Sequence, residues 1–152
     1  MADEYLALRQ LVEAYADAVC RRDADDWGAT WAPDGEWDLG PGRSMQGRDN
    51  IVPFWSQIMG TFPMAIQVIT GGKVLWVEGD RAAARWYITE YLRTGDGTNR
   101  VGHGVYHDRY VKVDGQWRFA RRSYNLLYSG APDLTGDVFP FPAEKAAEHA
   151  KP

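Results

Sequence analysis

The apolar residues in the first part of the chain repeat with the spacing of amphipathic helices. Between Asp3 and Arg22 they recur every three or four positions, which places them on one face of a helix. A short helical stretch is predicted from Asp25 to Trp31, stopped by Pro33, and a further helix over Asp49–Met59. The apolar face of the first helix consists of Leu8, Leu11, Val12, Tyr15, Ala16 and Val19.

The pattern changes further along to alternating and aromatic-rich runs, which are typical of strands. The turns between the runs are Glu78-Gly79-Asp80, Gly95-Asp96-Gly97 and Asp114-Gly115, which favour hairpins. A bulge is expected at Gly71-Gly72. The predicted strands are Glu36–Leu39, Met64–Thr70 with Gly72–Glu78, Arg81–Arg93, Asn99–Val113 and Gln116–Tyr128.

Helices followed by antiparallel strands predict an α+β domain. We expect a cone-shaped barrel, in which the N-terminal helices pack on a strongly curved antiparallel sheet. The 152 residues suit one domain, 1–152, with a core of about 6–128 and a C-terminal loop and tail over 129–152. Within that tail, Pro132–Pro142 has the composition of a loop, and Glu144–His149 is a short helix or a frayed end.

Charge and cysteine content exclude several classes of protein. Seventeen basic and twenty-one acidic side chains give a net charge of −4, so no basic excess favours nucleic-acid binding. The single cysteine, Cys20, cannot form an internal disulfide, which fits a reducing compartment. No apolar run reaches the roughly 18 residues of a membrane helix, and the start lacks the layout of a signal peptide. We therefore expect a soluble, cytoplasmic protein that binds neither nucleic acid nor membrane.

The sequence carries no signature of a bound metal or cofactor. Only His103 and His107 have the spacing of a ligand pair, and no third ligand lies nearby in the sequence. There is no Gly-x-Ser-x-Gly nucleophile elbow, no phosphate-binding loop and no dinucleotide fingerprint. The sequence therefore predicts chemistry without a metal and without a cofactor.

One carboxylate interrupts an apolar strand face. Alternation along Arg81–Arg93 places Trp86, Ile88, Glu90 and Leu92 on the same side of the strand. A carboxylate on such a face is either paired structurally or kept for acid–base chemistry, and the sequence leaves both interpretations open.

Five segments, in this order, carry a resemblance to a known family. The chain resembles the SnoaL-like branch of the nuclear transport factor 2-like superfamily from about Leu6 to Tyr128. The resemblance implies a helix-lined cone with a deep pocket, usually in a dimer or trimer. The segments are Tyr15-Ala-Asp-Ala-Val-Cys-Arg-Arg-Asp, Trp31-Ala-Pro-Asp-Gly-Glu-Trp, Gly47-Arg-Asp-Asn-Ile, Gly79-Asp-Arg-Ala-Ala-Ala-Arg-Trp and Tyr106-His-Asp-Arg-Tyr-Val-Lys-Val-Asp-Gly-Gln-Trp-Arg-Phe.

The chain departs from the catalytic pattern of the relatives that it resembles. Scytalone dehydratase, bile-acid 7α-dehydratase and hexachlorocyclohexane dehydrochlorinase perform cofactor-free eliminations with a His–Asp pair. Here the position of that Asp falls on Cys20, and the stretch Gln67–Gly72 that should supply the His contains none. The resemblance keeps Tyr15, Glu90 and Arg122 as pocket positions. It turns Trp37, Tyr106, Asp108 and Tyr124 inward, and His103 and His107 outward.

These residues lead to a functional hypothesis. Glu90 is the expected general base or acid, Arg122 holds a developing oxyanion, and Tyr15 or Tyr106 donates a proton or hydrogen bond to a leaving oxygen. The expected reaction is a cofactor-independent lyase step that removes water, or a small carbonyl such as formaldehyde, from a hydroxylated hydrophobic molecule. Seven Trp, eight Tyr and five Phe suit an aromatic substrate. The candidate substrate-binding residues are Trp37, Trp86, Ile88, Tyr106, Asp108, Tyr124 and Cys20.

Other interpretations stay open at this point. An isomerase or cyclase would use Glu90 to move a proton, and a non-catalytic small-molecule or partner-binding protein would need no acid–base group. Arg122, Glu90 and Asp108 could instead form a buried ion-pair network that closes the cone.

The partners expected are a small hydrophobic or aromatic substrate and further copies of the chain, as a homodimer or homotrimer. The candidate subunit contact is the outer strand face with Val105, His107, Arg109 and Val111. The segment Ala131–Pro142 is either a cover for the mouth of the cone, its own or a neighbour's, or a surface loop.

Overall fold

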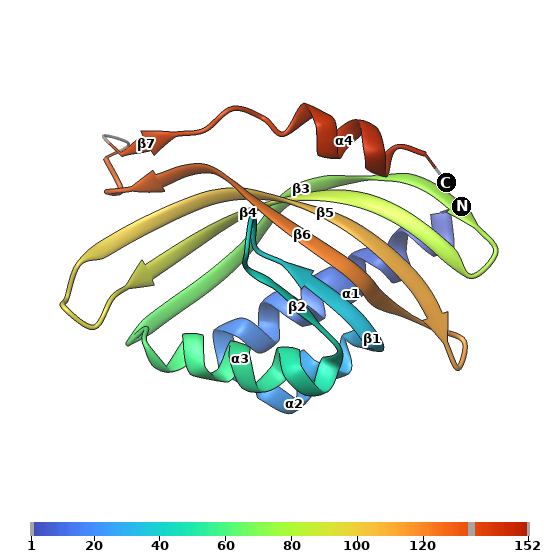
Figure 1. Cartoon of the computed structure of the whole chain (residues 1–152), viewed down its shortest axis with the longest axis horizontal. Coiled ribbons are helices and arrows are strands. Elements are labelled where there is room, and N and C mark those ends of the chain that lie inside the picture. Colours follow the sequence, from blue (N-terminus) through green and yellow to red (C-terminus); the bar gives the residue numbers. More distant parts are fainter. Residues whose placement is uncertain (1, 134–135, 152) are drawn as a thin grey trace.

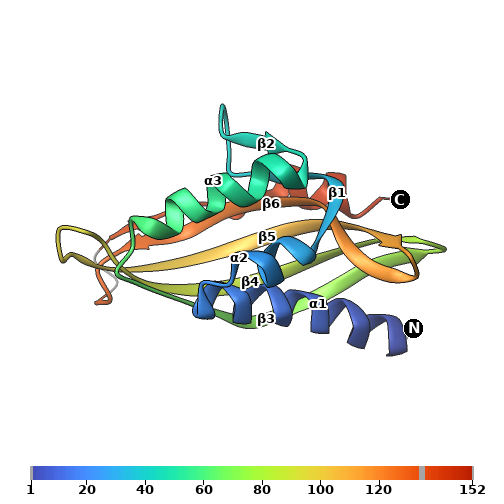
Figure 2. The same cartoon turned by 90° about the horizontal axis from the view of Figure 1, so that it is seen from below.

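The computed structural model describes residues 2–133 and 136–151 of the chain. Figures 1 and 2 show a long curved sheet with three helices along one side, namely α1 (Ala2–Arg21), α2 (Ala24–Ala29) and α3 (Arg48–Gly60). A short fourth helix, α4 (Ala143–His149), lies on the other side. The strands are β1 (Trp31–Asp38), β2 (Ser44–Gln46), β3 (Met64–Glu78), β4 (Arg81–Arg93), β5 (Asn99–Val113), β6 (Gln116–Gly130) and β7 (Asp137–Val138).

The sheet follows the order β2-β1-β6-β5-β4-β3, and the short β7 also pairs with β6. Its neighbours run antiparallel except for β1 and β6, which run parallel. The expected α+β architecture, with N-terminal helices on a strongly curved sheet, is confirmed. Among the described strands β2 and β3 are not hydrogen-bonded to each other, so the sheet stays open instead of closing into a barrel.

The segment around Trp31 differs from its prediction as the end of a helix. The helix α2 stops at Ala29, and the Thr30 hydroxyl donates a hydrogen bond of 2.6 Å to the Trp27 carbonyl. The Phe119 amide of β6 donates to the Thr30 carbonyl at 2.9 Å, which draws the following residues into the sheet. Strand β1 therefore begins at Trp31, before the predicted Glu36. It pairs with β2, a strand that no pattern in the sequence predicts.

The predicted bulge in the long third strand is confirmed. The register of β3 against β4 shifts between Ile69 and Gly71. Gly72 follows at a close approach, because a Cβ atom there would lie 2.1 Å from Cε3 of Trp86. Only glycine fits beside the indole at this position.

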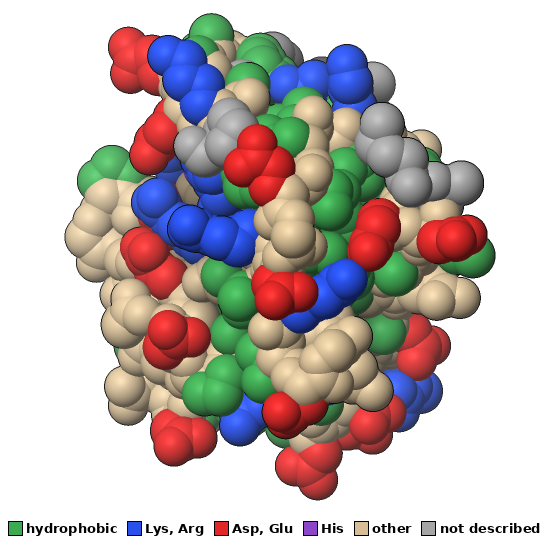
Figure 3. Space-filling view, turned by 90° about the vertical axis from the view of Figure 1, so that its right-hand side faces the viewer, with side chains coloured by type: hydrophobic (Ala, Val, Ile, Leu, Met, Phe, Trp, Pro, Cys, Tyr) green, Lys and Arg blue, Asp and Glu red, His purple; other side chains and the backbone are tan. Residues whose placement is uncertain are grey.

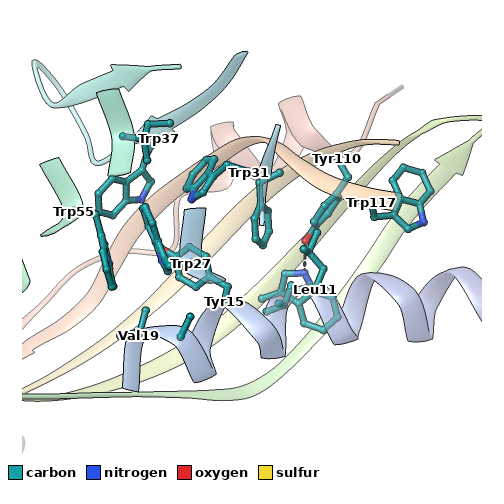
Figure 4. Close-up of a cluster of buried hydrophobic side chains, with 14 of the residues drawn as sticks. Leu11, Tyr15, Val19, Trp27, Trp31, Trp37, Trp55, Tyr110 and Trp117 are labelled. Atoms are coloured by element: carbon teal, nitrogen blue, oxygen red, sulfur yellow. Dashed lines mark hydrogen bonds between the residues drawn. The ribbon is translucent and has the colours of Figure 1, made fainter. Parts of the chain in front are cut away.

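The core fills the space between the helices and the concave side of the sheet (Figure 4). At one end Tyr15 of α1 lies against Trp27, with ring centroids 5.2 Å apart, and Trp27 stacks on Trp55 of α3 at 4.5 Å. At the other end lie Tyr110 and Trp117. Such aromatic packing buries large areas and holds the helices at a fixed angle on the sheet.

The C-terminal segment covers part of the outer face of the sheet (Figure 1). His107 of β5 is fully buried there, with its ring centroid 5.4 Å from that of His149 on α4. The Arg109 guanidinium donates to the Glu148 carbonyl at 2.9 Å. The face predicted to contact a partner subunit is thus covered, at His107 and Arg109, by the chain itself. The predicted Glu144–His149 element is a helix, α4. Part of the expected loop Pro132–Pro142 forms β7, which pairs with β6. Residues 134–135 of that loop lie outside the described residues.

Acidic and basic side chains are interspersed on the end of the molecule that carries both termini (Figure 3). None of the helices in the described part of the chain is both long and apolar enough to cross a membrane.

Candidate active site

A cavity of about 460 Å³ lies between α1, α3 and the concave face of the sheet. Its volume is within the usual range for small-molecule sites. The walls are largely apolar. They include Trp37 of β1, Trp55 of α3, Phe62 just after α3, and Leu92 of β4. Ten polar side chains line the same space, namely Tyr15, Arg43, Gln67, Glu90, Thr94, Arg100, Tyr106, Tyr124, Asn125 and Ser129.

Glu90 lies on the inner face of β4, directly between two strand partners. It pairs across the sheet with Gln67 of β3 on one side and Gly102 of β5 on the other. Since Gly102 has no side chain, the carboxyl group has room to face the cavity. Burial raises the pKa of Glu90, while the polar groups of Tyr124 and Gln67 and the charge of Arg122 lower the pKa in opposition. A carboxyl group whose pKa is shifted upward in an apolar cavity suits proton transfer.

Two tyrosines place their hydroxyl groups together at the cavity wall. The hydroxyl oxygens of Tyr15 on α1 and Tyr106 on β5 lie 3.4 Å apart. Burial raises the pKa of Tyr15 to about 12 and the pKa of Tyr106 well above its ordinary value. Both phenols are therefore neutral at pH 7 and can donate hydrogen bonds to a bound oxygen.

Tyr124 of β6 supplies a third phenol. Its ring centroid is 4.9 Å from that of Tyr106. Burial and the nearby charge of Glu90 raise the pKa of Tyr124, and the phenol in turn lowers the pKa of Glu90. The Tyr124 hydroxyl is therefore neutral at pH 7 and lies beside the Glu90 carboxyl group at the cavity wall.

Arg122 and Asp108 form a buried ion pair behind the tyrosines. Nε and Nη2 of Arg122 lie 3.0 and 3.1 Å from the two carboxylate oxygens of Asp108, and both side chains are fully buried. The guanidinium carbon lies 4.2 Å from the ring centroid of Tyr15 and 3.8 Å from that of Tyr106. Neither charged residue lines the cavity. The structure thus places Arg122 and Asp108 behind the cavity wall, paired with each other, whereas the prediction had Arg122 touch an oxyanion and Asp108 touch substrate.

The ion-pair interpretation holds for Arg122 and Asp108 and not for Glu90. Glu90 faces the cavity, and no ion pair joins its carboxylate to a cation among the described residues.

Three other predicted binding residues also lie outside the cavity lining. Trp86 and Ile88 share the inner face of β4 with Glu90, but they pack in the part of the core that side chains fill completely. The Trp86 indole donates to the Tyr110 hydroxyl at 2.7 Å, at the far end of the core. Cys20 is exposed, and its thiol exchanges hydrogen bonds with the backbone of Gln67. Tyr15, Trp37, Glu90, Tyr106 and Tyr124 are the predicted residues that the structure brings together.

The sequence interpretation missed six lining residues with polar side chains, namely Arg43, Gln67, Thr94, Arg100, Asn125 and Ser129. Gln67 lies in the stretch where the resemblance led us to look only for a histidine. Arg100 shares its strand face with Gly102 and Tyr106, so alternation alone could have found it. Arg43 lies in the turn before β2, where no periodic pattern applies.

Within residues 2–133 and 136–151, no three His, Cys, Asp or Glu side chains gather as a metal site would require.

Comparison with known proteins defines the family. The model of the SnoaL-like domain matches residues 1–123, and the chain belongs to this family, as its resemblance led us to expect. An uncharacterized protein of Mycobacterium tuberculosis is 29% identical over 120 residues, which cover 77% of this chain and 81% of that protein.

Solved structures share the fold. A provisionally assigned scytalone dehydratase of Novosphingobium aromaticivorans aligns with a TM-score of 0.80 and 22% identity, over 93% of this chain and 98% of that one. A hexachlorocyclohexane dehydrochlorinase of Novosphingobium barchaimii aligns with a TM-score of 0.78 and 17% identity, over 93% and 97%. At these identities the likeness concerns the fold.

Proposed function

We propose that the protein is a cofactor-independent lyase that acts on a hydroxylated, hydrophobic small molecule in this cavity. The observation that carries the proposal is the position of Glu90, a carboxyl group of raised pKa that faces an apolar cavity together with three phenols. Two structures of the same fold are named as a dehydratase and a dehydrochlorinase, which are lyases. The family and the site thus support the same class of reaction.

The site supplies both proton transfers that the loss of water requires. Glu90 as carboxylate takes a proton from a carbon next to an electron-withdrawing group, and the electrons of that bond form the new double bond. The hydroxyl on the neighbouring carbon leaves as water after it receives a proton. Tyr15 and Tyr106 are placed to donate to the oxygen on which negative charge develops. In the loss of formaldehyde, Glu90 would instead take the proton of the hydroxymethyl O–H group, and the C=O bond of formaldehyde forms as the carbon–carbon bond breaks. The electron pair of the broken bond moves into the electron-withdrawing group, whose oxygen receives a proton from Tyr15 or Tyr106.

Arg122 acts in this scheme through the tyrosines. Its guanidinium lies over the rings of Tyr15 and Tyr106, and its positive charge lowers the pKa of both phenols against the effect of burial. Arg122 is therefore a positioning residue, which makes the tyrosines better donors to a developing oxyanion.

The test compares Glu90→Gln with the parent protein on a panel of hydroxylated aromatic and steroid-like compounds. Loss of the carboxylate should lower turnover by about 100-fold or more. Glu78→Gln is the matched control, because Glu78 is an exposed residue at the end of β3 outside the cavity lining. Alkene absorbance reports loss of water, and a formaldehyde assay reports carbon–carbon cleavage. Equal turnover in both variants would contradict the proposal.

An isomerase is the second candidate, because the neutral pair Tyr15–Tyr106 can polarise a carbonyl while Glu90 moves a proton. The two activities differ in the product. An isomerase leaves the mass of the substrate unchanged, whereas a lyase lowers it by the mass of water or formaldehyde, and mass spectrometry of the reaction mixture separates them.

A homodimer or homotrimer stays a prediction. Its support is an exposed apolar strip on the outer face of β3 and β4, where Ile66 and Tyr91 pair across the strands and Val68 follows. Sedimentation analysis of the protein and of Ile66→Lys would test it, since a charge in a subunit contact should shift the protein toward the monomer.

A further inference from the structure

Two arginine side chains reach the cavity where it meets solvent. Arg43 and Arg100 are both exposed and both line the cavity, which places them at its mouth. Glu90 is the only acidic side chain in the described lining. The mouth is therefore basic, although the chain as a whole is acidic, with a net charge of −4.

The fold brings the two arginines to opposite sides of one strand. Arg43 follows β1 and Arg100 lies near the start of β5, and these strands flank β6 in the sheet. Arg100 lies on the inner face of β5, two positions before Gly102 and on the same side. Its guanidinium donates to the Ser129 hydroxyl of β6, which holds the side chain at the mouth.

Neither cation has a carboxylate partner among residues 2–133 and 136–151. No ion pair joins Arg43 or Arg100 to an acidic side chain in the part of the chain that the structure describes. Four other arginines do form such pairs, namely Arg9, Arg21, Arg121 and Arg122. Unpaired guanidinium groups beside an apolar cavity attract an anion and can bind it with two parallel hydrogen bonds.

The position of Glu90 fixes where that anion binds. Gly102, the strand partner of Glu90, is two residues from Arg100, a separation of about 7 Å along the strand. Leu92 is the strand partner of Arg100, so an apolar inner-face residue lies next to the arginine and two positions from Glu90. A second negative charge close to Glu90 would be repelled, whereas at the mouth it meets two positive charges.

We propose that the cavity binds an aromatic carboxylic acid, with its carboxylate held by Arg43 and Arg100 at the mouth. The ring then lies on the apolar wall of Trp55, Phe62 and Leu92, and the reacting carbon reaches Glu90. The identification of this acid as a substrate rests on the proposed function, whereas its binding does not.

Calorimetric titration with a matched pair of probes, naphthalene-2-carboxylate and its neutral carboxamide, tests the proposal. The acid should bind about tenfold tighter than the amide, a difference of about 1.4 kcal/mol. Arg100→Leu and Arg43→Leu should each weaken the acid severalfold, should leave the amide unchanged, and together should abolish the preference. Arg100→Lys should retain part of the preference for the acid over the amide. This conservative variant separates the loss of a charge from the loss of the folded structure. Arg93→Leu is the control, because it removes the same charge from the outer face of β4.

Equal affinity for acid and amide, no binding of the acid, or an equal loss in Arg93→Leu would overturn the proposal. The titrations are repeated in Glu90→Gln, which should bind the acid while its turnover is lost. Normal turnover in that variant with a retained acid preference would contradict the lyase alone. Lost turnover without an acid preference would contradict the carboxylate site alone.

Discussion

Gly104 of β5 lies directly beneath the ring of Tyr124 on β6. A Cβ atom at position 104 would lie 2.2 Å from Cε2 of the tyrosine and 2.5 Å from its hydroxyl oxygen. The absence of a side chain at Gly104 therefore allows the phenol to lie against the sheet beside Glu90. Gly104 lies within a strand and not in a turn, and its role is to leave space for a residue of the site.

Gly104→Ala should displace Tyr124, because the added methyl group and the ring cannot occupy the same space. We expect a loss of about 1–3 kcal/mol in the free energy of unfolding and a lowered turnover. Gly71→Ala is the control, since a Cβ atom at this strand position would meet nothing within 4 Å and Gly71 lies outside the cavity lining. Urea denaturation and a turnover assay measure both effects. Equal stability of the two variants would contradict the steric argument.

Removal of one partner of the buried ion pair should be strongly destabilising. In Asp108→Asn the Arg122 cation remains buried without a counter-charge, and we expect a loss of about 3–5 kcal/mol in the free energy of unfolding. The surface pair of Arg9 and Glu13 provides the comparison, because Glu13→Gln breaks an exposed contact and should change stability little. Chemical denaturation of both variants gives the values.

The pH dependence of turnover should report on the neighbours of Glu90. Since Tyr124 and Gln67 lower the pKa of Glu90 against burial, Tyr124→Phe and Gln67→Leu should raise that pKa further. If Glu90 acts as a base, the rising limb of the kcat/KM profile then moves to higher pH in both variants. Tyr87→Phe, outside the cavity lining, should leave the limb in place. A limb that moves to lower pH would exclude Glu90 as the base.

The packing of α4 on the sheet should make stability sensitive to mild acid. Burial lowers the pKa of His107 to about 4, with help from the charges of His149, Arg85 and Lys145, and burial also lowers the pKa of His149. The unfolded chain binds protons first as the pH falls, so this stability is complete above about pH 6.5 and is lost toward about pH 4. Denaturation of His107→Gln across this range should show a weaker dependence on pH than the parent protein.

Alternation and turn residues in the sequence were sufficient to predict the long strands and the inner face of β4 with Glu90. They could not predict which residues of that face lie at the cavity and which lie in the packed core. Trp86 and Glu90 share one face, yet the cavity occupies only one end of that face and aromatic side chains fill the other. Periodicity reports which side of a sheet a residue faces, whereas the packing of the helices decides where space is left.

The missed features depend on tertiary contacts. The three residues of β2 form a strand because β1 lies beside them, and Arg43 reaches the cavity because this hairpin folds over β6. The pairing of Arg122 with Asp108 was one of the interpretations that the sequence left open, and the register of β5 against β6 decides for it by placing the two directly opposite each other. A single sequence shows two residues of opposite charge on inner faces and not that they meet.

The parallel pairing of β1 with β6 has a consequence for the order in which the molecule forms. Asp38 accepts a hydrogen bond from Ser123, a residue 85 positions later in the chain. Until that late strand has left the ribosome, β1 and its hairpin have no neighbour in the sheet, and one wall of the cavity does not exist. Contacts between such distant segments slow folding. The cavity thus lacks one wall until β6 joins the sheet, although the helices and β1 that form its other walls come much earlier in the chain.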